Sequence, residues 1–109
     1  MEKKALGAFG EEKAAELLME KGYEIIARNF ACRGGEIDLI AKDKNRLIFV
    51  EVKTRTNLAY GRPSEALTPK KLERLRRAAA YYLYTHPGNP VEVRFDVIEV
   101  FFNHLEGVM

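Results

Sequence analysis

The chain has 109 residues, of which 47% are hydrophobic and 31% are charged, and its formal net charge is +2 at pH 7. We expect one domain over residues 1–109 with its core at about 5–102, because this length leaves no room for a second domain. The single cysteine excludes an intrachain disulfide, and no segment is apolar enough for a signal peptide or a membrane span. We therefore expect a cytoplasmic protein without membrane association.

Periodicity and capping signals predict six elements in chain order. The helices are expected at about residues 6–21 and 69–85, and the strands at about 23–29, 36–42, 46–54 and 91–101. Gly22 ends the first helix, and Thr68 with Pro69 supplies the N-cap and first residue of the second. Gly7 and Gly10 weaken the first helix, and close packing on a neighbour explains them better than near approach to a phosphate or a partner. The order α-β-β-β-α-β predicts an α/β domain with a mixed β-sheet flanked by helices.

The second and third predicted strands carry charged residues where a core requires apolar side chains. Burying unpaired carboxylates is costly, so this placement predicts a use for them. A two-residue loop at residues 44–45 would place Asp38 directly opposite Glu51 in an antiparallel ladder. The same register would place Glu36 opposite Lys53. A loop with an odd number of residues would instead turn Asp38 to the other face.

Facing carboxylates at Asp38 and Glu51 would repel each other by roughly 3 kcal/mol at an effective dielectric constant near 20. A cation between them would offset this repulsion. Carboxylates, a main-chain carbonyl and water suit Mg²⁺ or Mn²⁺, whereas zinc prefers histidine and cysteine. The simpler alternative is a solvated, salt-bridged hairpin rim with no chemical role.

Asp38 followed by Glu51-Val52-Lys53 resembles the Asp…(Asp/Glu)-x-Lys active site of the restriction-endonuclease-like nuclease superfamily. From about residue 5 to 100, the chain more closely resembles the YraN family of small bacterial proteins, which are predicted endonucleases related to archaeal Holliday junction resolvases. The motifs that carry this resemblance are Gly7-x-x-Gly10-Glu11, Gly35-Glu36-Ile37-Asp38-Leu39-Ile40-Ala41, Phe49-Val50-Glu51-Val52-Lys53-x-Arg55, Lys71 and Arg94-Phe95-Asp96. Ile37 stands where the superfamily motif often has proline.

The resemblance implies a restriction-endonuclease-like core and metal-dependent hydrolysis of phosphodiester bonds. Asp38, Glu51 and the main-chain carbonyl of Val52 would bind Mg²⁺ or Mn²⁺. Lys53 would hold or activate the attacking water. We therefore expect an enzyme, with catalytic residues on the second and third strands.

Two further acids are candidates for the same site. Glu36 is expected either to orient Lys53 or to lie at the edge of the metal site, and the orienting role is favoured. Glu11 matches the family's Gly-Glu position on the first helix, which in related resolvases brings an extra carboxylate toward the metal. The alternative is that an acid such as Glu12 lies in the first helical turn and only favours the helix dipole.

Basic residues around and within the second helix are candidate nucleic-acid contacts. They are Arg55, Arg62, Lys70, Lys71 and Arg74. From residue 62 to residue 77 there are six basic residues and two acids, a local excess of four. The alternative is an ordinary solvated helix face.

Together these features predict a metal-dependent endonuclease that is selective for branched DNA rather than for a base sequence, because no sequence-reading module is recognisable. Related resolvases are dimers, which suggests a homodimer. Its surface could use a set of aromatic residues, most of which core packing and ordinary surface tyrosines also explain, namely Tyr81, Tyr82, Tyr84, Phe101 and Phe102. One alternative function is a non-catalytic nucleic-acid or protein-binding module. Another is hydrolysis of a small phosphorylated substrate, which an enclosed pocket would favour.

Overall fold

The computed structural model describes residues 3–55, 68–88, 92–102 and 107–109. The helices are α1 (Lys3–Glu20) and α2 (Pro69–Thr85), and the strands are β1 (Glu24–Cys32), β2 (Gly35–Asp43), β3 (Arg46–Arg55) and β4 (Glu92–Phe101). The predicted α/β fold and its element order are confirmed, and they are consistent with a restriction-endonuclease-like core. Within the described ranges, neither helix combines the length and apolar character needed to cross a membrane.

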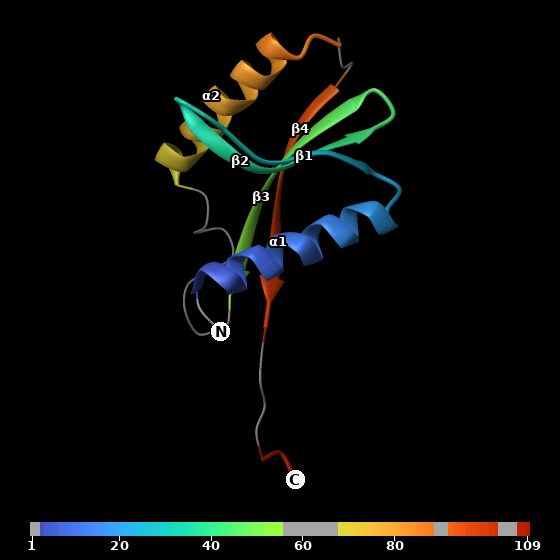
Figure 1. The fold of residues 1–109 in the computed structure, drawn as a ribbon, viewed down its shortest axis with the longest axis vertical. Coiled ribbons are helices and arrows are strands. Elements are labelled where there is room, and N and C mark those ends of the chain that lie inside the picture. Colours follow the sequence, from blue (N-terminus) through green and yellow to red (C-terminus); the bar gives the residue numbers. More distant parts are fainter. Residues whose placement is uncertain (1–2, 56–67, 89–91, 103–106) are drawn as a thin grey trace.

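The described strands form one mixed sheet in the order β1-β2-β3-β4 (Figure 1). The pairs β1–β2 and β2–β3 are antiparallel, whereas β3 and β4 are parallel. A parallel pair requires a crossover connection, and α2 lies in that connection. The two helices cover opposite faces of the sheet, so both faces are buried over the middle strands.

Alternation along β3 divides the core into two apolar clusters, one under each helix. Leu47 and Phe49 point toward α2, whereas Ile48 and Val50 point toward α1. The α2 cluster also contains Ile37, Ile40, Leu75, Ala78, Ala79 and Tyr82, and the α1 cluster also contains Ala14, Ala15, Leu18, Leu39 and Ala41. Burial on both faces explains the continuous apolar run from residue 47 to residue 50.

The loop between β2 and β3 has the predicted even length. Asp43 pairs with Arg46, and Lys44 has φ 57°, which a two-residue hairpin turn favours. The expected register holds along the hairpin as far as Leu39 opposite Val50.

Beyond that rung β2 and β3 no longer pair. The expected ladder pairs of Asp38 with Glu51 and of Glu36 with Lys53 are therefore not formed. β2 continues along β1 instead, where Glu36 lies opposite Ala31. The loop parity was predicted correctly, but the prediction wrongly assumed that the two strands stay paired to their ends.

The separation occurs where β1 and β2 both become irregular. Asn29 has φ 50°, and neither it nor Asp38 belongs to the β1–β2 pairing, which continues on both sides of them. Ile37 packs in the α2 cluster but Leu39 packs in the α1 cluster, although residues two apart share a face in a regular strand. Asp38 is the residue at which the two faces exchange.

Gly10 of α1 is buried against Thr54 of β3, and a Cβ atom at this position would overlap the threonine side chain. Close packing therefore explains Gly10, and it brings the next residue, Glu11, to the C-terminal part of β3. At Gly7, no described atom lies within 4 Å of the Cβ position, so close packing does not explain that glycine.

The aromatic residues considered for a dimer surface divide between the interior and the surface. Tyr82 belongs to the α2 cluster, and Phe102 packs on Phe9 with ring centroids 5.2 Å apart. Tyr81, Tyr84 and Phe101 are exposed. The homodimer stays a prediction.

Candidate active site

The carboxylate of Asp38 lies in the gap that opens between β2 and β3. Its Oδ2 atom accepts a hydrogen bond of 2.7 Å from the main-chain N–H of Val52. The side chain thus satisfies a main-chain donor of β3 at a point where the β2–β3 pairing has ended. This contact fixes Asp38 at the end of the hairpin ladder, with its other carboxylate oxygen left for other partners.

Glu51 reaches Asp38 from the α2 side of the sheet, the side to which Phe49 also points. Burial raises the pKa of Glu51 to about 7, with a further contribution from the negative charge of Asp38, and Lys71 of α2 lowers it in part. The two carboxyl groups are close enough to share a hydrogen bond. Asp38 and Glu51 are therefore brought together as expected, but across the end of the ladder rather than within it.

Glu11 reaches Asp38 from the other side, on α1. Burial raises the pKa of Glu11, and the charges of Asp38 and Glu36 raise it further. A hydrogen bond with Asn29, the residue with the left-handed backbone, acts in the opposite direction. Glu11 therefore lies with the other acids of the candidate site.

Glu12 has a different environment from its neighbour. Its carboxylate accepts a hydrogen bond of 2.6 Å from Arg28, and both side chains are substantially exposed. The helix begins at Lys3, so Glu11 and Glu12 lie beyond its first turn. The helix-dipole explanation of these acids is therefore wrong, because that effect is confined to the helix ends.

Asp38 is thus the centre of a row of carboxylates, with Glu11 on one side of the sheet and Glu51 on the other. Within the described residues, no three Asp, Glu, His or Cys side chains are grouped so that they could hold one metal ion. A pair is enough for Mg²⁺, which is usually held by one or two carboxylates and keeps several water ligands. The oxygen donors of Asp38 and Glu51 therefore fit Mg²⁺ or Mn²⁺ and do not match the ligand preference of zinc.

The two candidate lysines differ in their relation to these acids. Lys71 is close enough to Glu51 to lower its pKa. Lys53 is partly buried and forms no hydrogen bond or ion pair with the described residues. Glu36 likewise makes no such contact with Lys53, and its charge acts on Glu11 and Glu51 instead. The expected role of Glu36 in orienting Lys53 is therefore not supported by a hydrogen bond or an ion pair between the two side chains.

A groove of about 440 Å³ opens beside Glu51, between α2 and the start of β2. Its charged lining consists of two acids and three cations, namely Glu36, Glu51, Arg33, Lys71 and Arg74. The turn between β1 and β2 forms one wall and is packed tightly on α2, since a Cβ atom at Gly35 would lie 2.6 Å from the main-chain oxygen of Arg74. Arg33 in this turn was not a candidate from the sequence, and an Arg-Gly-Gly turn before the acidic strand is the signal that could have indicated it.

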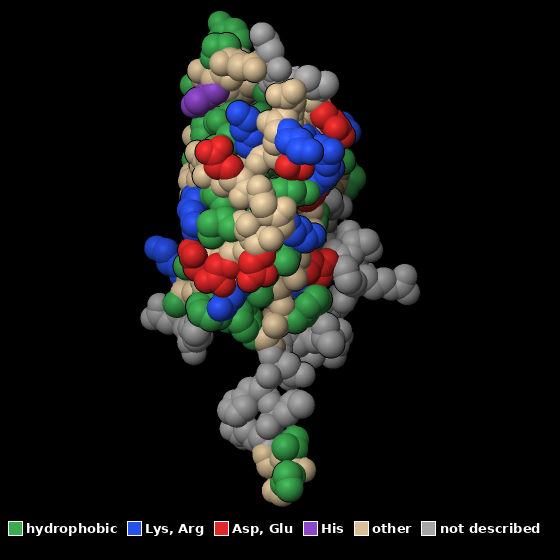
Figure 2. Space-filling model, turned by 90° about the vertical axis from the view of Figure 1, so that its right-hand side faces the viewer, with side chains coloured by type: hydrophobic (Ala, Val, Ile, Leu, Met, Phe, Trp, Pro, Cys, Tyr) green, Lys and Arg blue, Asp and Glu red, His purple; other side chains and the backbone are tan. Residues whose placement is uncertain are grey.

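Of the other predicted nucleic-acid contacts, the two that belong to the described residues, Arg55 and Lys70, do not line this groove. The guanidinium of Arg55 lies 3.5 Å from the carboxylate of Glu99, and about 14% of each side chain is exposed. Lys70 is exposed on α2 outside the groove, and Arg62 lies outside the described residues. Figure 2 shows a face of the molecule on which acidic and basic side chains are interspersed. This face is therefore not a uniformly basic surface.

Comparisons with known proteins place the candidate site in a family context. A family model described as "Uncharacterised protein family UPF0102" matches residues 10–100, which confirms the YraN resemblance. A UPF0102 protein of Caldicellulosiruptor saccharolyticus is 50% identical over 103 residues, covering 94% of this chain and 87% of that protein. One from Beutenbergia cavernae is 47% identical over 114 residues, covering 97% of each. One from Symbiobacterium thermophilum is 54% identical over 95 residues, covering 87% of this chain and 80% of that protein.

Proposed function

The chain belongs to the uncharacterised protein family UPF0102, and we propose that it is a metal-dependent endonuclease that hydrolyses phosphodiester bonds in branched DNA. The observation that carries this proposal is the pairing of Asp38 with Glu51 at the break between β2 and β3, next to a groove with three cations. Carboxylates that bind a metal and cations that bind phosphate are the two components that phosphodiester hydrolysis requires. We also propose that the enzyme acts in the cytoplasm.

In this mechanism Asp38 and Glu51 would hold Mg²⁺ or Mn²⁺, together with the main-chain carbonyl of Val52. The bound ion would offset negative charge on the phosphate and lower the pKa of a water. Glu51 must lose its proton to act as a ligand, and the positive charge of Lys71 favours that ionised form. Lys53 projects from the same face of β3 as Glu51 and would hold the attacking water.

The groove would bind the sugar–phosphate backbone through Arg33, Lys71 and Arg74. Contacts to phosphates position a strand without reading its bases. Selectivity would therefore come from the path that the strands of a junction or flap follow to the site, as expected for a structure-selective enzyme.

A cleavage assay with purified protein tests the proposal. Four-way junctions, flaps, plain duplexes and single strands are incubated with Mg²⁺, with Mn²⁺ or with EDTA. We expect metal-dependent cleavage of branched DNA that leaves 5′-phosphate and 3′-hydroxyl ends. Absence of cleavage with either metal at enzyme excess, together with salt-dependent DNA binding, would favour the non-catalytic binding module instead.

The volume of the groove favours a second candidate, hydrolysis of a small phosphorylated substrate. At about 440 Å³ the groove is within the size range of small-molecule sites. Competition distinguishes the two functions. A small phosphodiester should compete with DNA only at high concentration if the substrate is DNA, and should be hydrolysed faster than any oligonucleotide if it is not.

Replacing Lys71 or Arg74 by alanine is expected to weaken DNA binding by about fivefold to tenfold in EDTA, because each change removes one phosphate contact. The slope of log affinity against log salt should fall by about one for each residue. Fluorescence anisotropy at several salt concentrations measures both quantities. Arg76→Ala is the matched control, because Arg76 is exposed on the same helix but does not line the groove. An equal loss in Arg76→Ala would show that the groove is not the binding path.

A further inference from the structure

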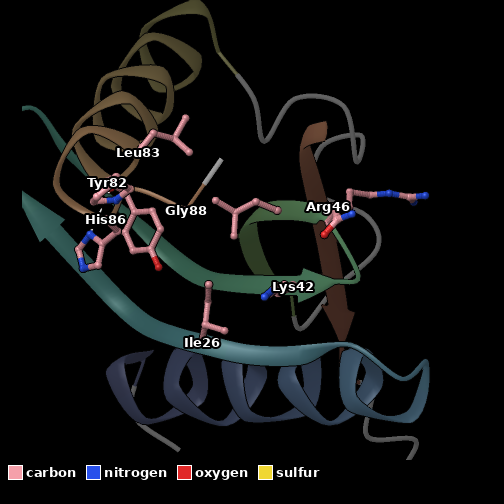
Figure 3. A pocket seen from close by; sticks show the side chains of 10 residues that line it. Ile26, Lys42, Arg46, Tyr82, Leu83, His86 and Gly88 are labelled. Carbon is pink, nitrogen blue, oxygen red and sulfur yellow. Dashed lines mark hydrogen bonds between the residues drawn. The ribbon is translucent and has the colours of Figure 1, made fainter. Parts of the chain in front are cut away.

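A second cavity, of about 270 Å³, lies at the other end of α2 (Figure 3). Its walls come from the last turn of α2, the residues that follow it, and strands β1, β2 and β3. Tyr82 in this cavity lies eleven positions after Lys71 of the groove along α2, a helical rise of about 16 Å. The cavity is therefore a separate place on the molecule and has no part in the proposed nuclease site.

Tyr82 gives this cavity an unused polar group. Only 9% of the residue is exposed, yet its hydroxyl forms no hydrogen bond within the described structure. Figure 3 shows the ring projecting from α2 with the hydroxyl directed toward Ile26 on β1, across the cavity. The hydroxyl is not one of the fully buried side-chain atoms that lack a partner, so it reaches the open cavity and can donate a hydrogen bond to a ligand bound there.

The charges around the cavity select for an anion. Lys42 and Arg46 line it, and no carboxylate of the described residues does. Arg46 is paired with Glu92 at 3.2 Å, whereas Lys42 forms no ion pair within the described residues. The ammonium of Lys42 is therefore the cation available to a ligand.

The remaining walls suit a flat apolar body. Leu47 and Leu83 supply aliphatic surface. The rings of Tyr82 and His86 are stacked, with centroids 4.1 Å apart and planes inclined by 10°. The cavity volume is slightly below the usual range for drug-sized ligands, which limits the ligand to a small molecule.

We propose that this cavity binds a small organic anion, a single flat ring system that carries a phosphate or carboxylate and is no larger than a mononucleotide. The anionic group would accept hydrogen bonds from Lys42 and from the hydroxyl of Tyr82, and the ring would lie against Leu47 and Leu83. A free nucleotide and the terminal nucleotide of a nucleic-acid strand both have this chemistry.

Binding is tested on the full chain in EDTA with nucleoside 5′-monophosphates, a 5′-phosphorylated dinucleotide, benzoate, the unphosphorylated nucleosides and inorganic phosphate. At ten times its Kd, a ring-bearing anion should raise the melting temperature by about 5–10 °C. Nucleosides and inorganic phosphate should raise it by less than about 1 °C. The relative affinities for the monophosphates, the dinucleotide and benzoate distinguish a free nucleotide from the terminal nucleotide of a strand and from another ring-bearing anion. Methyl NMR should show shifts at Leu47 and Leu83 but not at Leu18, which lies in the α1 cluster.

Two variants test the named contacts. Tyr82→Phe and Lys42→Gln should each weaken binding by about tenfold, the effect of losing one hydrogen bond to a charged group. Tyr84→Phe and Lys44→Gln are the controls, because both residues are exposed and outside the cavity. The proposal is overturned if no compound binds at 10 mM, if both test variants bind as tightly as the wild type, or if inorganic phosphate binds as well as the ring-bearing anions. Lys42 is exposed, so Lys42→Gln remains informative even if Tyr82→Phe disturbs the core.

Discussion

Asp38→Asn is expected to lower Mg²⁺-dependent DNA cleavage by about 10³-fold, the scale on which loss of one electrostatic group in an active site reduces kcat. The side-chain oxygen of asparagine can still accept the hydrogen bond that Val52 donates to Asp38. The end of the hairpin ladder should therefore keep its geometry while the site loses a charged metal ligand. Initial rates of junction cleavage measure the effect, and circular dichroism checks the fold.

Asp43→Asn is the matched control for this substitution. Asp43 lies on the same strand but at the hairpin turn, where it pairs with Arg46. We expect this variant to cleave at the wild-type rate. Calorimetry with Mn²⁺ gives a second measurement that does not require activity, because Asp38→Asn should bind the ion weakly or not at all. Cleavage retained by Asp38→Asn would exclude the proposed mechanism.

Local signals explain why much of the fold could be predicted from the sequence. Thr68 was expected to cap α2, and its hydroxyl oxygen accepts a hydrogen bond of 3.1 Å from the main-chain N–H of Lys71. The even hairpin loop was also predicted, because two residues between regular strands fix which side chains share a face. Both predictions depend on residues within a few positions of each other.

The candidate site was predicted less completely because it depends on contacts between distant elements. Asp38 was expected to meet Glu51 in a regular ladder, but the pairing of β2 with β3 ends at Leu39 and the two carboxyl groups meet beyond it. Asn29, on β1, has a left-handed backbone conformation, and no sequence pattern predicts it. The approach of Lys71 to Glu51 likewise depends on how α2 packs across the sheet, which periodicity within α2 does not specify.

The pKa of Glu51 leads to the second major prediction, a stability that depends on pH. In the folded protein this pKa is about 7, above the ordinary value of 4.5. Between these pH values the folded state binds more protons than the unfolded state, so the free energy of unfolding falls as the pH rises and then levels off above pH 7. The full difference corresponds to roughly 3 kcal/mol, which solvent screening of this partly exposed group reduces to about 1–2 kcal/mol.

Glu51→Gln removes this loss, because glutamine stays neutral at every pH. In EDTA we expect the variant to be more stable than the wild type by about 1–2 kcal/mol at pH 8 and equally stable near pH 4.5, as measured by urea denaturation. Mg²⁺ should stabilise the wild type at pH 8 but not the variant, since anything that binds only the folded state shifts the equilibrium toward it. Glu16→Gln, at an exposed position on α1, is the control and should show neither effect.

A stability difference that does not change between pH 4.5 and pH 8 would mean that Glu51 is not held beside Asp38 as a protonated partner. A pH-dependent difference without stabilisation by Mg²⁺ would keep the carboxylate pair but remove its role as a metal site.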